Sequence, residues 1–233
     1  MTTLILNNLR KSYTQGETSI DVLKGINLRL EEGESVSIVG PSGGGKSTLL
    51  SILSGIDKSN EGQLLIQDTD ISQLSDHEMT LFRGKNFGII FQQFHLISHL
   101  TALENVMLPL EILQSEKGIS ISSVEIKEKA IALLGEVGLS QRLTHYPSQL
   151  SGGEAQRVAI ARALISNPKI LLADEPSGNL DVKTGEHVMS LLFELVKKYK
   201  STLLLVTHSP ELAKQCERSF ALEGGKLIEL KNV

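Results

Sequence analysis

The sequence predicts an α/β protein built around a parallel β-sheet, and three observations support that prediction. Two near-continuous apolar runs, 170–173 and 203–206, have the pattern of strands buried on both faces of a parallel sheet. A third apolar segment, 35–39, leads directly into a glycine-rich loop. Helical periodicity follows that loop, so strand and helix alternate along the chain as they do in α/β folds.

The N-terminal part is expected to consist mainly of strands and turns. The alternation of apolar and polar residues over 26–30 is typical of a half-buried strand. A helix is expected at about 46–54, where Gly55 provides a stop signal. Strands are expected at 4–6, 22–23, 26–30, 35–39 and 62–66.

Residues from about 95 to 165 are expected to be mostly helical. Thr101 and Glu104 form a capping-box pattern ahead of an apolar stretch. Apolar residues then recur at helical spacing, and Gly138 lies where that helix should end. Beyond this region the alternation resumes, with a helix expected at about 184–199 and another opening at Ser209.

Composition excludes several classes of protein. With 23 Lys and Arg against 27 Asp and Glu, the net charge is −4, which does not suit sequence-independent nucleic-acid binding. The single cysteine, Cys216, excludes an internal disulfide framework and a cysteine-built zinc site. The sequence has no apolar run near the roughly 18 residues of a membrane span, and no signal-peptide pattern. We therefore expect a soluble protein of the cytoplasm.

The glycine-rich loop has the spacing of a phosphate-binding P-loop. Its glycines allow backbone N–H groups to surround phosphate oxygens, and the following helix N-terminus adds positive partial charge. Lys46 is expected to contact the β- and γ-phosphates, and the Ser47 hydroxyl is a ligand candidate for Mg²⁺. The nucleotide-binding candidates are Gly40, Pro41, Ser42, Gly43, Gly44, Gly45, Lys46, Ser47 and Thr48.

Polar residues follow two further buried-type strands. Asp174 and Glu175 end the strand at 170–173, and His208 follows the strand at 203–206. Ligands bind at the carboxyl edge of an open parallel sheet, so we expect these side chains near the phosphates. Asp174 suits the Mg²⁺ shell and Glu175 suits a general base. Pro176 is expected to hold Glu175 in an extended conformation.

A second candidate anion site precedes a helix. Ser151 and Glu154 form a capping box, which explains these two residues but not the glycine pair Gly152 and Gly153. Paired glycines at a helix N-terminus expose backbone N–H groups to a closely approaching anion. Because the chain already contains one P-loop, this second site indicates the nucleotide of a partner.

Together these residues resemble the ABC transporter ATPase family over essentially the whole chain. The order matches as well, with the P-loop, the signature 151–154, the strand 170–174 followed by Glu175, the D-loop 177–181 and a switch histidine at His208. The resemblance assigns Gln92, rather than its neighbour Gln93, to catalysis and to the metal site. It also places Tyr13 at the position of an aromatic residue that stacks on adenine. The sequence alone does not decide whether the Tyr13 side chain lies in the core or on the surface.

The resemblance carries further expectations about fold, ligands and partners. It implies a P-loop NTPase core at about 1–92 and 167–233, with an N-terminal antiparallel β region and a helical subdomain at about 93–166. ATP and Mg²⁺ are the implied cofactors. The implied partners are a second copy, bound head to tail through ATP with Ser151 acting across the interface, and a membrane permease. Such a subunit works at the cytoplasmic face of the inner membrane.

Within the family, the segment 91–106 looks like the lipoprotein-release (LolD-like), macrolide-export (MacB-like) and YbbA-like group. This implies an ATPase that powers export, or extraction from the membrane, through a separate membrane subunit. The alternative is a soluble ABC ATPase without a transport role, similar to the SufC-like assembly factor. A P-loop kinase fits poorly, since it does not explain residues 150–154.

Overall fold

The computed structural model describes residues 2–16, 18–116 and 119–230. These residues form two compact units, one made of 1–79 and 200–233 and the other of 80–199. This grouping differs from the predicted subdivision, in which the helical subdomain covers about 93–166. The second unit also includes residues 80–92 and 167–199, which were predicted to belong to the core. The predicted boundaries stay a prediction, and each unit is described by itself.

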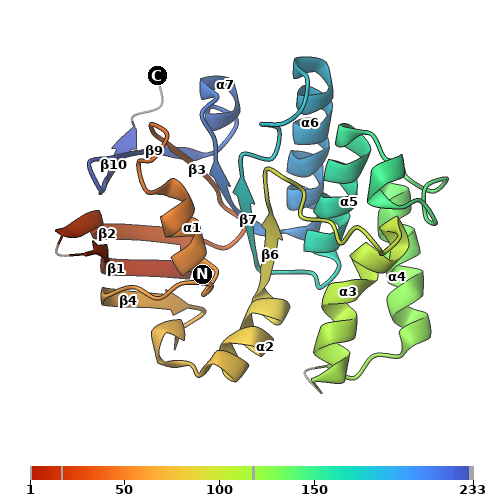
Figure 1. The fold of residues 1–233 in the computed structure, drawn as a ribbon, viewed down its shortest axis with the longest axis horizontal. Helices are drawn as coiled ribbons and strands as arrows, with labels where there is room; N and C mark the ends of the chain where they lie inside the picture. Colours follow the sequence, from red (N-terminus) through yellow and green to blue (C-terminus); the bar gives the residue numbers. More distant parts are fainter. Residues whose placement is uncertain (1, 17, 117–118, 231–233) are drawn as a thin grey trace. The chain divides into compact units, whose positions relative to one another are not determined.

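The first unit contains an antiparallel sheet with the strand order β2-β1-β4-β5 (Figure 1). Alternate residues of β2 are buried, among them Ile26, Leu28 and Leu30, as the sequence predicts. β1 and β2 are longer than predicted because their outer residues carry no regular apolar pattern, and β5 was not predicted. Their bounds are β1 Thr2–Gln15, β2 Thr18–Glu31, β4 Glu61–Ile66 and β5 Thr69–Asp70.

The same unit contains a second set of paired strands. β3 (Ser35–Val39) pairs in parallel with β8 (Thr202–Val206) on one side and with β9 (Arg218–Glu223) on the other. β9 also pairs antiparallel with β10 (Lys226–Leu230). Every residue of β8 is buried, which confirms the predicted pattern of a central strand. The unit's further elements are α1 Lys46–Leu53, η1 Ile71–Gln73 and α7 Pro210–Ala213.

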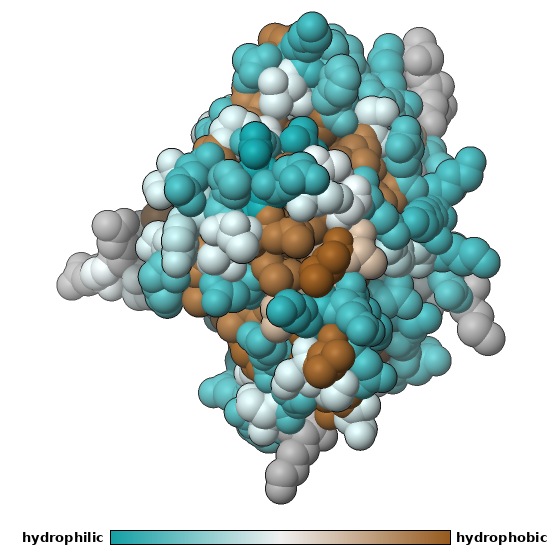
Figure 2. All heavy atoms as spheres, turned by 90° about the vertical axis from the view of Figure 1, so that its right-hand side faces the viewer, coloured by the Kyte–Doolittle hydropathy of each residue, from teal (hydrophilic) through white to brown (hydrophobic). Residues whose placement is uncertain are grey.

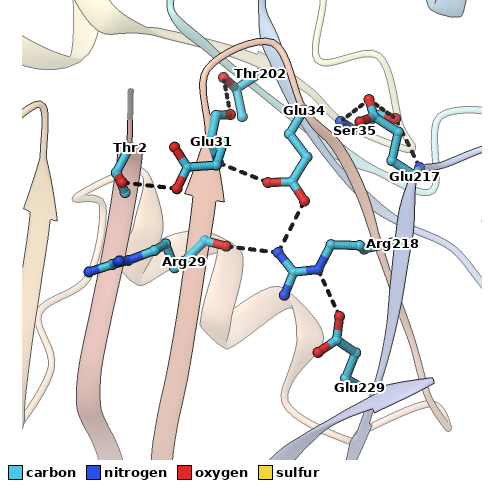
Figure 3. Close-up of polar contacts among 9 residues, drawn as sticks. All are labelled: Thr2, Arg29, Glu31, Glu34, Ser35, Thr202, Glu217, Arg218 and Glu229. Atoms are coloured by element: carbon cyan, nitrogen blue, oxygen red, sulfur yellow. Dashed lines mark hydrogen bonds and ion pairs between the residues drawn. The ribbon is translucent and has the colours of Figure 1, made fainter. Parts of the chain in front are cut away.

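An arginine at the start of β9 connects the strands of this unit (Figure 3). Arg218 donates from Nε to Glu229 Oε1 at 2.7 Å and from Nη1 to Glu34 Oε1 at 3.0 Å. Its Nη1 also donates to the backbone oxygen of Arg29 on β2 at 3.1 Å. One side chain therefore holds β2, β9, β10 and the start of β3 together by charge-assisted hydrogen bonds.

The second unit combines a parallel strand pair with helices. β6 and β7 pair in parallel, with Ile90 opposite Ala173. Helices α3 and α4 pack against each other and against α5 (Figure 1). The bounds are β6 Phe87–Ile90, α3 Ala102–Ser115, α4 Ser123–Glu136, η2 Pro147–Gln149, α5 Gly152–Leu164, β7 Ile170–Asp174 and α6 Val182–Tyr199, while α2 spans Asp76–Asn86 and enters from the first unit.

The helix starts follow the local signals. Thr101, Ser122 and Ser151 each cap a helix, with the glutamate three residues later completing a capping box. The predicted helical region is confirmed in α3, α4 and α5. Within the described part of the chain, no helix has the length and apolarity required to cross a membrane.

Candidate functional site

The P-loop lies between β3 and α1, as predicted. Lys46 is the first residue of α1 and is buried, and its Nζ donates to the backbone oxygens of Gly40 and Pro41 at 2.9 Å each. The side chain therefore folds back across the loop and holds its ammonium group beside the helix N-terminus. This is where a phosphate would meet both the lysine charge and the helix N–H groups.

Gly45 shows why the loop requires glycine at this position. Its φ angle is +94°, in the left-handed region, and a Cβ there would lie 2.9 Å from Val22 Cγ1 on β2. A side chain would be strained and would also collide with the hairpin. The loop is therefore packed directly against β2.

His208 lies at the same sheet edge as the P-loop. Ile38 of β3 is opposite Val206 of β8 in the parallel register, and Thr207 donates its N–H to Ile38 O at 3.2 Å. Each strand thus reaches its carboxyl end at the same level, one leading to Gly40 and the other to His208. The side chain of His208 is exposed. Within the first unit, this is the proximity that the sequence predicts.

We expect His208→Ala to bind ATP with little change but to hydrolyse it about 10²-fold more slowly, as when one polar contact to the transition state is removed. Binding by calorimetry and turnover by phosphate release measure the two effects separately. His187→Ala, an exposed histidine of α6, is the matched control and should hydrolyse ATP like the parent. Loss of ATP binding in a folded His208→Ala protein would contradict a catalytic role.

Tyr13 is on the surface, which resolves the alternative that the sequence left open. It lies on β1 opposite Ile20 of β2, and 43% of its surface is exposed. Tyr13 and Ile20 therefore form an exposed aromatic–aliphatic pair on the hairpin. Its ring is available to a flat ligand, as an adenine-stacking residue requires.

In the second unit, Gln92, Asp174 and Glu175 share one edge. Because β6 and β7 are parallel and in register at Ile90 and Ala173, the residues that follow both strands emerge side by side. Asp174 is the last residue of β7, and Gln92 follows β6. The carboxylates and the amide predicted to act together are thus gathered within this unit.

The prediction that Pro176 holds Glu175 extended is wrong. The φ angle of Glu175 is +44°, so the residue adopts the left-handed conformation. A turn follows at once, in which Gly178 donates its N–H to Glu175 O at 2.9 Å. This turn reverses the chain after β7 and imposes the strained conformation, which for a non-glycine residue costs about 1–3 kcal/mol.

Asn179 is a site residue whose contact the sequence reasoning missed. Its Nδ2 donates to Gln92 O at 3.0 Å, and Gln92 Nε2 donates to Asn179 Oδ1 at 3.4 Å. Gly178 permits this approach, since a Cβ there would lie 2.7 Å from Gln92 Nε2. The D-loop is therefore joined to the segment after β6 by two hydrogen bonds between Asn179 and Gln92.

The signature segment is built as a capping box that an arginine reinforces. Ser151 N donates to Glu154 Oε2 at 2.9 Å, and Glu154 N donates to Ser151 Oγ at 3.2 Å. Arg142, which the sequence reasoning did not select, donates from Nε to Glu154 Oε1 at 2.8 Å. The Ser151 backbone N–H and the Arg142 guanidinium lower the pKa of Glu154 to about 2. Glu154 is therefore ionised at neutral pH and fixes the position of Ser151.

The two signature glycines have different surroundings. Gly152 is exposed at the first turn of α5, as the anion-site prediction requires. Gly153 is buried, and a Cβ there would collide with Thr184 Cγ2 of α6. The close packing of α5 against α6 therefore requires glycine at position 153, which the sequence alone did not indicate.

The donor set predicted for Mg²⁺ has suitable chemistry. Ser47 presents an exposed hydroxyl in the first turn of α1, Asp174 offers a carboxylate and Gln92 an amide oxygen. Hard oxygen donors of these kinds are what Mg²⁺ prefers. The described residues contain no group of three or more His, Cys, Asp or Glu side chains that could hold a metal ion.

Comparisons with known proteins show which family this chain resembles. A family model described as ABC transporter matches residues 23–178. An uncharacterized ABC transporter ATP-binding protein of Methanocaldococcus jannaschii is 49% identical over 225 residues, which cover 97% of both chains. The lipoprotein-releasing system ATP-binding protein LolD of Geobacter metallireducens is 47% identical over 221 residues, covering 95% of this chain and 96% of LolD. These relatives favour a transporter subunit over a SufC-like assembly factor.

A solved structure shows the same fold. The dimeric structure of a post-hydrolysis state of the ATP-binding cassette MJ0796, bound to ADP and Pi, has a TM-score of 0.89 and 44% identity to this chain. The match covers 99% of both chains. The similarity thus includes both units described above.

Proposed function

The chain belongs to the ABC transporter family as an ATP-binding and ATP-hydrolysing subunit, and on that premise we propose that it powers export, or extraction from the membrane, through a separate membrane subunit. The main support for a nucleotide site is the position of Lys46. Its side chain is held beside the α1 N-terminus, at the sheet edge where His208 also lies. This arrangement suits the terminal phosphates of a nucleotide.

The site residues have complementary roles in this proposal. Lys46 binds the β- and γ-phosphates, and the loop N–H groups of Gly43 to Lys46 surround them. Glu175 accepts a proton from the attacking water, and Gln92 orients that water. His208 donates to the γ-phosphate as charge develops on its oxygens. When bound, Mg²⁺ would neutralise phosphate charge at Ser47, Gln92 and Asp174.

The second copy of the chain completes the site. Ser151 and Gly152, both exposed at the α5 N-terminus, form a second phosphate-binding half-site, which the family resemblance assigns to the partner's nucleotide. Two solved structures of one relative, the ATP-binding cassette MJ0796, are dimeric. We therefore propose a head-to-tail homodimer in which each ATP joins the P-loop of one copy to Ser151 of the other.

The membrane partner would dock on a groove of the second unit. The groove has a volume of about 400 Å³ and is lined by apolar side chains of α2, β6 and α3. Phe91 and His95 line it as well. His95 belongs to residues 92–100, the docking segment, which we propose contacts the membrane subunit. Figure 2, which views the side where α3–α5 lie, shows apolar areas within a mostly hydrophilic face. Such an area is typical of an interaction site.

The docking segment is firmly anchored. Arg162 of α5 donates from Nη2 to Phe94 O at 2.7 Å and from Nη1 to His95 O. Phe94 and His95 both have positive φ angles, so the guanidinium holds an otherwise strained turn. Phe94, Leu96, Ile97 and Leu100 are half-buried. Their exposed parts are available to a partner.

We expect a cysteine at His95 to cross-link to the co-expressed membrane subunit in membranes. Burial raises the pKa of the Cys216 thiol to about 12, so the introduced thiol is the reactive one. Glu32→Cys, in the turn after β2, is the matched exposed control and should give no such product. Equal cross-linking from both positions, or none from His95→Cys, would contradict docking at the groove.

Purification from detergent-solubilised membranes tests the transport role itself. A transporter subunit at the cytoplasmic face of the membrane should copurify with an integral membrane protein in fixed stoichiometry. A SufC-like assembly factor should instead copurify with soluble proteins. Recovery with soluble partners alone would overturn the proposed coupling while leaving the ATPase activity intact.

A further inference from the structure

A polar cluster fixes the orientation of Tyr13. The Tyr13 hydroxyl donates to Asp57 Oδ2 at 2.7 Å. Asp57 lies in the segment after α1, and its other oxygen, Oδ1, accepts from Lys11 Nζ at 2.7 Å. The hydroxyl end of an exposed ring is therefore attached to a carboxylate that is itself held in place.

Lys11 completes the cluster from the same strand as Tyr13. Its Nζ also donates to Lys58 O at 2.7 Å, and only 10% of its side chain is exposed. The same ammonium lies over the Tyr13 ring, 4.8 Å from the centroid, which is a cation–π geometry. One face of the ring is thus covered by Lys11, which leaves the opposite face for a ligand.

The charges in the cluster support one another. Partial burial alone would raise the pKa of Asp57. Hydrogen bonds from Lys11 and Tyr13 nevertheless hold this pKa below its ordinary value. The hydrogen bond to Asp57 and partial burial raise the pKa of Tyr13. At neutral pH the carboxylate is therefore ionised and the phenol protonated, so the contact between them persists.

The ring is also close to the P-loop. Thr48, in the first turn of α1 beside Lys46 and Ser47, is near enough to the Tyr13 hydroxyl to oppose the rise in its pKa. Val22, on the strand paired with β1, packs against Gly45. The platform and the phosphate site therefore belong to one contiguous part of the first unit.

We propose that Lys11 and Asp57 are positioning residues that preset the Tyr13 ring as a platform for the flat base of the nucleotide. The proposal rests on the proposed function, since it requires nucleotide at the P-loop. A base stacks well on an aromatic ring, and a ring that is already immobile loses less entropy when the base arrives. The cluster thus increases affinity for the nucleoside part without contacting the phosphates.

Calorimetry with ADP and with tripolyphosphate separates the two parts of the site. Asp57→Ala should bind ADP about five-fold more weakly, the effect expected for freeing one side chain, and tripolyphosphate equally well. Asp57→Asn keeps an acceptor for the tyrosine hydroxyl and should recover much of the affinity. Asp76→Ala is the matched control, because Asp76 is an exposed carboxylate paired with Lys58. It should bind both ligands like the parent.

Tyr13→Phe keeps the Lys11–Asp57 ion pair and so tests the cluster without unpairing a buried lysine. We expect Tyr13→Phe to weaken ADP binding as much as Asp57→Ala does. The double variant Tyr13→Phe/Asp57→Ala should show no further loss of affinity. Tyr13→Ala should cost about 20-fold, because stacking itself is removed.

Two results would overturn the inference: unchanged ADP affinity in Tyr13→Phe and Asp57→Ala, or an equal loss for ADP and tripolyphosphate. The second result would show that the cluster supports the fold rather than the base site. If the parent protein bound neither ligand, the proposed function would fail first.

Discussion

Lys46→Ala is expected to reduce ATP turnover by at least about 10²-fold and to weaken ATP binding markedly. The substitution removes the one ammonium group that the loop holds beside the α1 N-terminus. Charge-assisted contacts to phosphate are the strongest in such a site, and helix N–H groups alone do not replace them. The measurement is phosphate release at saturating ATP, with ATP affinity determined separately by calorimetry.

Lys58→Ala is the matched control for that experiment. Lys58 is an exposed lysine paired with Asp76 at 3.3 Å, outside the P-loop. The Lys58→Ala protein should turn over ATP like the parent. Near-normal turnover by a correctly folded Lys46→Ala protein would contradict the assignment of the P-loop as the phosphate site.

Glu175→Gln should bind ATP like the parent and hydrolyse it about 10²–10⁴-fold more slowly, the range for loss of a general base. The amide has the same shape as the carboxylate, so the left-handed turn between Glu175 and Gly178 should persist. Single-turnover hydrolysis separates the chemical step from nucleotide binding and product release.

Glu194→Gln, an exposed glutamate of α6, controls for the change of charge and should leave hydrolysis intact. If Glu175→Gln hydrolyses ATP at the parent rate, another group must activate the water. If it fails to bind ATP while remaining folded, Glu175 has a structural rather than a catalytic role.

Elements with strong local signals were predictable from the sequence. The apolar runs of β7 and β8, the capping boxes at Thr101 and Ser151, and the loop from Gly40 to Lys46 each carry their own pattern. The β1–β2 hairpin was underestimated, because the outer parts of its strands are mostly exposed and mix polar residues with isolated apolar ones such as Ile20. Apolar periodicity does not detect residues whose place in a sheet comes from backbone pairing alone.

The contacts that orient the site residues could not be predicted in this way. Gln92 and Asn179 are separated by 87 residues, and Tyr13 and Asp57 by 44. Arg142 precedes Glu154 by 12 residues, which corresponds to no local spacing rule. Such pairs form because the fold brings distant segments together. The conformation of Glu175 was mispredicted for a local reason, since the turn closed by the hydrogen bond from Gly178 outweighed the influence of Pro176.

In the proposed dimer, ATP joins two copies through the P-loop of one and Ser151 of the other. Each half-site alone provides only part of the phosphate contacts, so ATP should bind the dimer more tightly and favour it by mass action. Ser151→Arg should prevent this association, because it places a bulky cation at the phosphate position. It should leave the folded monomer intact.

Sizing chromatography of Glu175→Gln, with and without ATP, tests the claim most directly. We expect elution near the monomer mass of 25.4 kDa without nucleotide and at about twice that mass with ATP. The double variant with Ser151→Arg should remain monomeric in both runs. An unchanged mass on addition of ATP, or dimerisation that Ser151→Arg does not affect, would contradict the account.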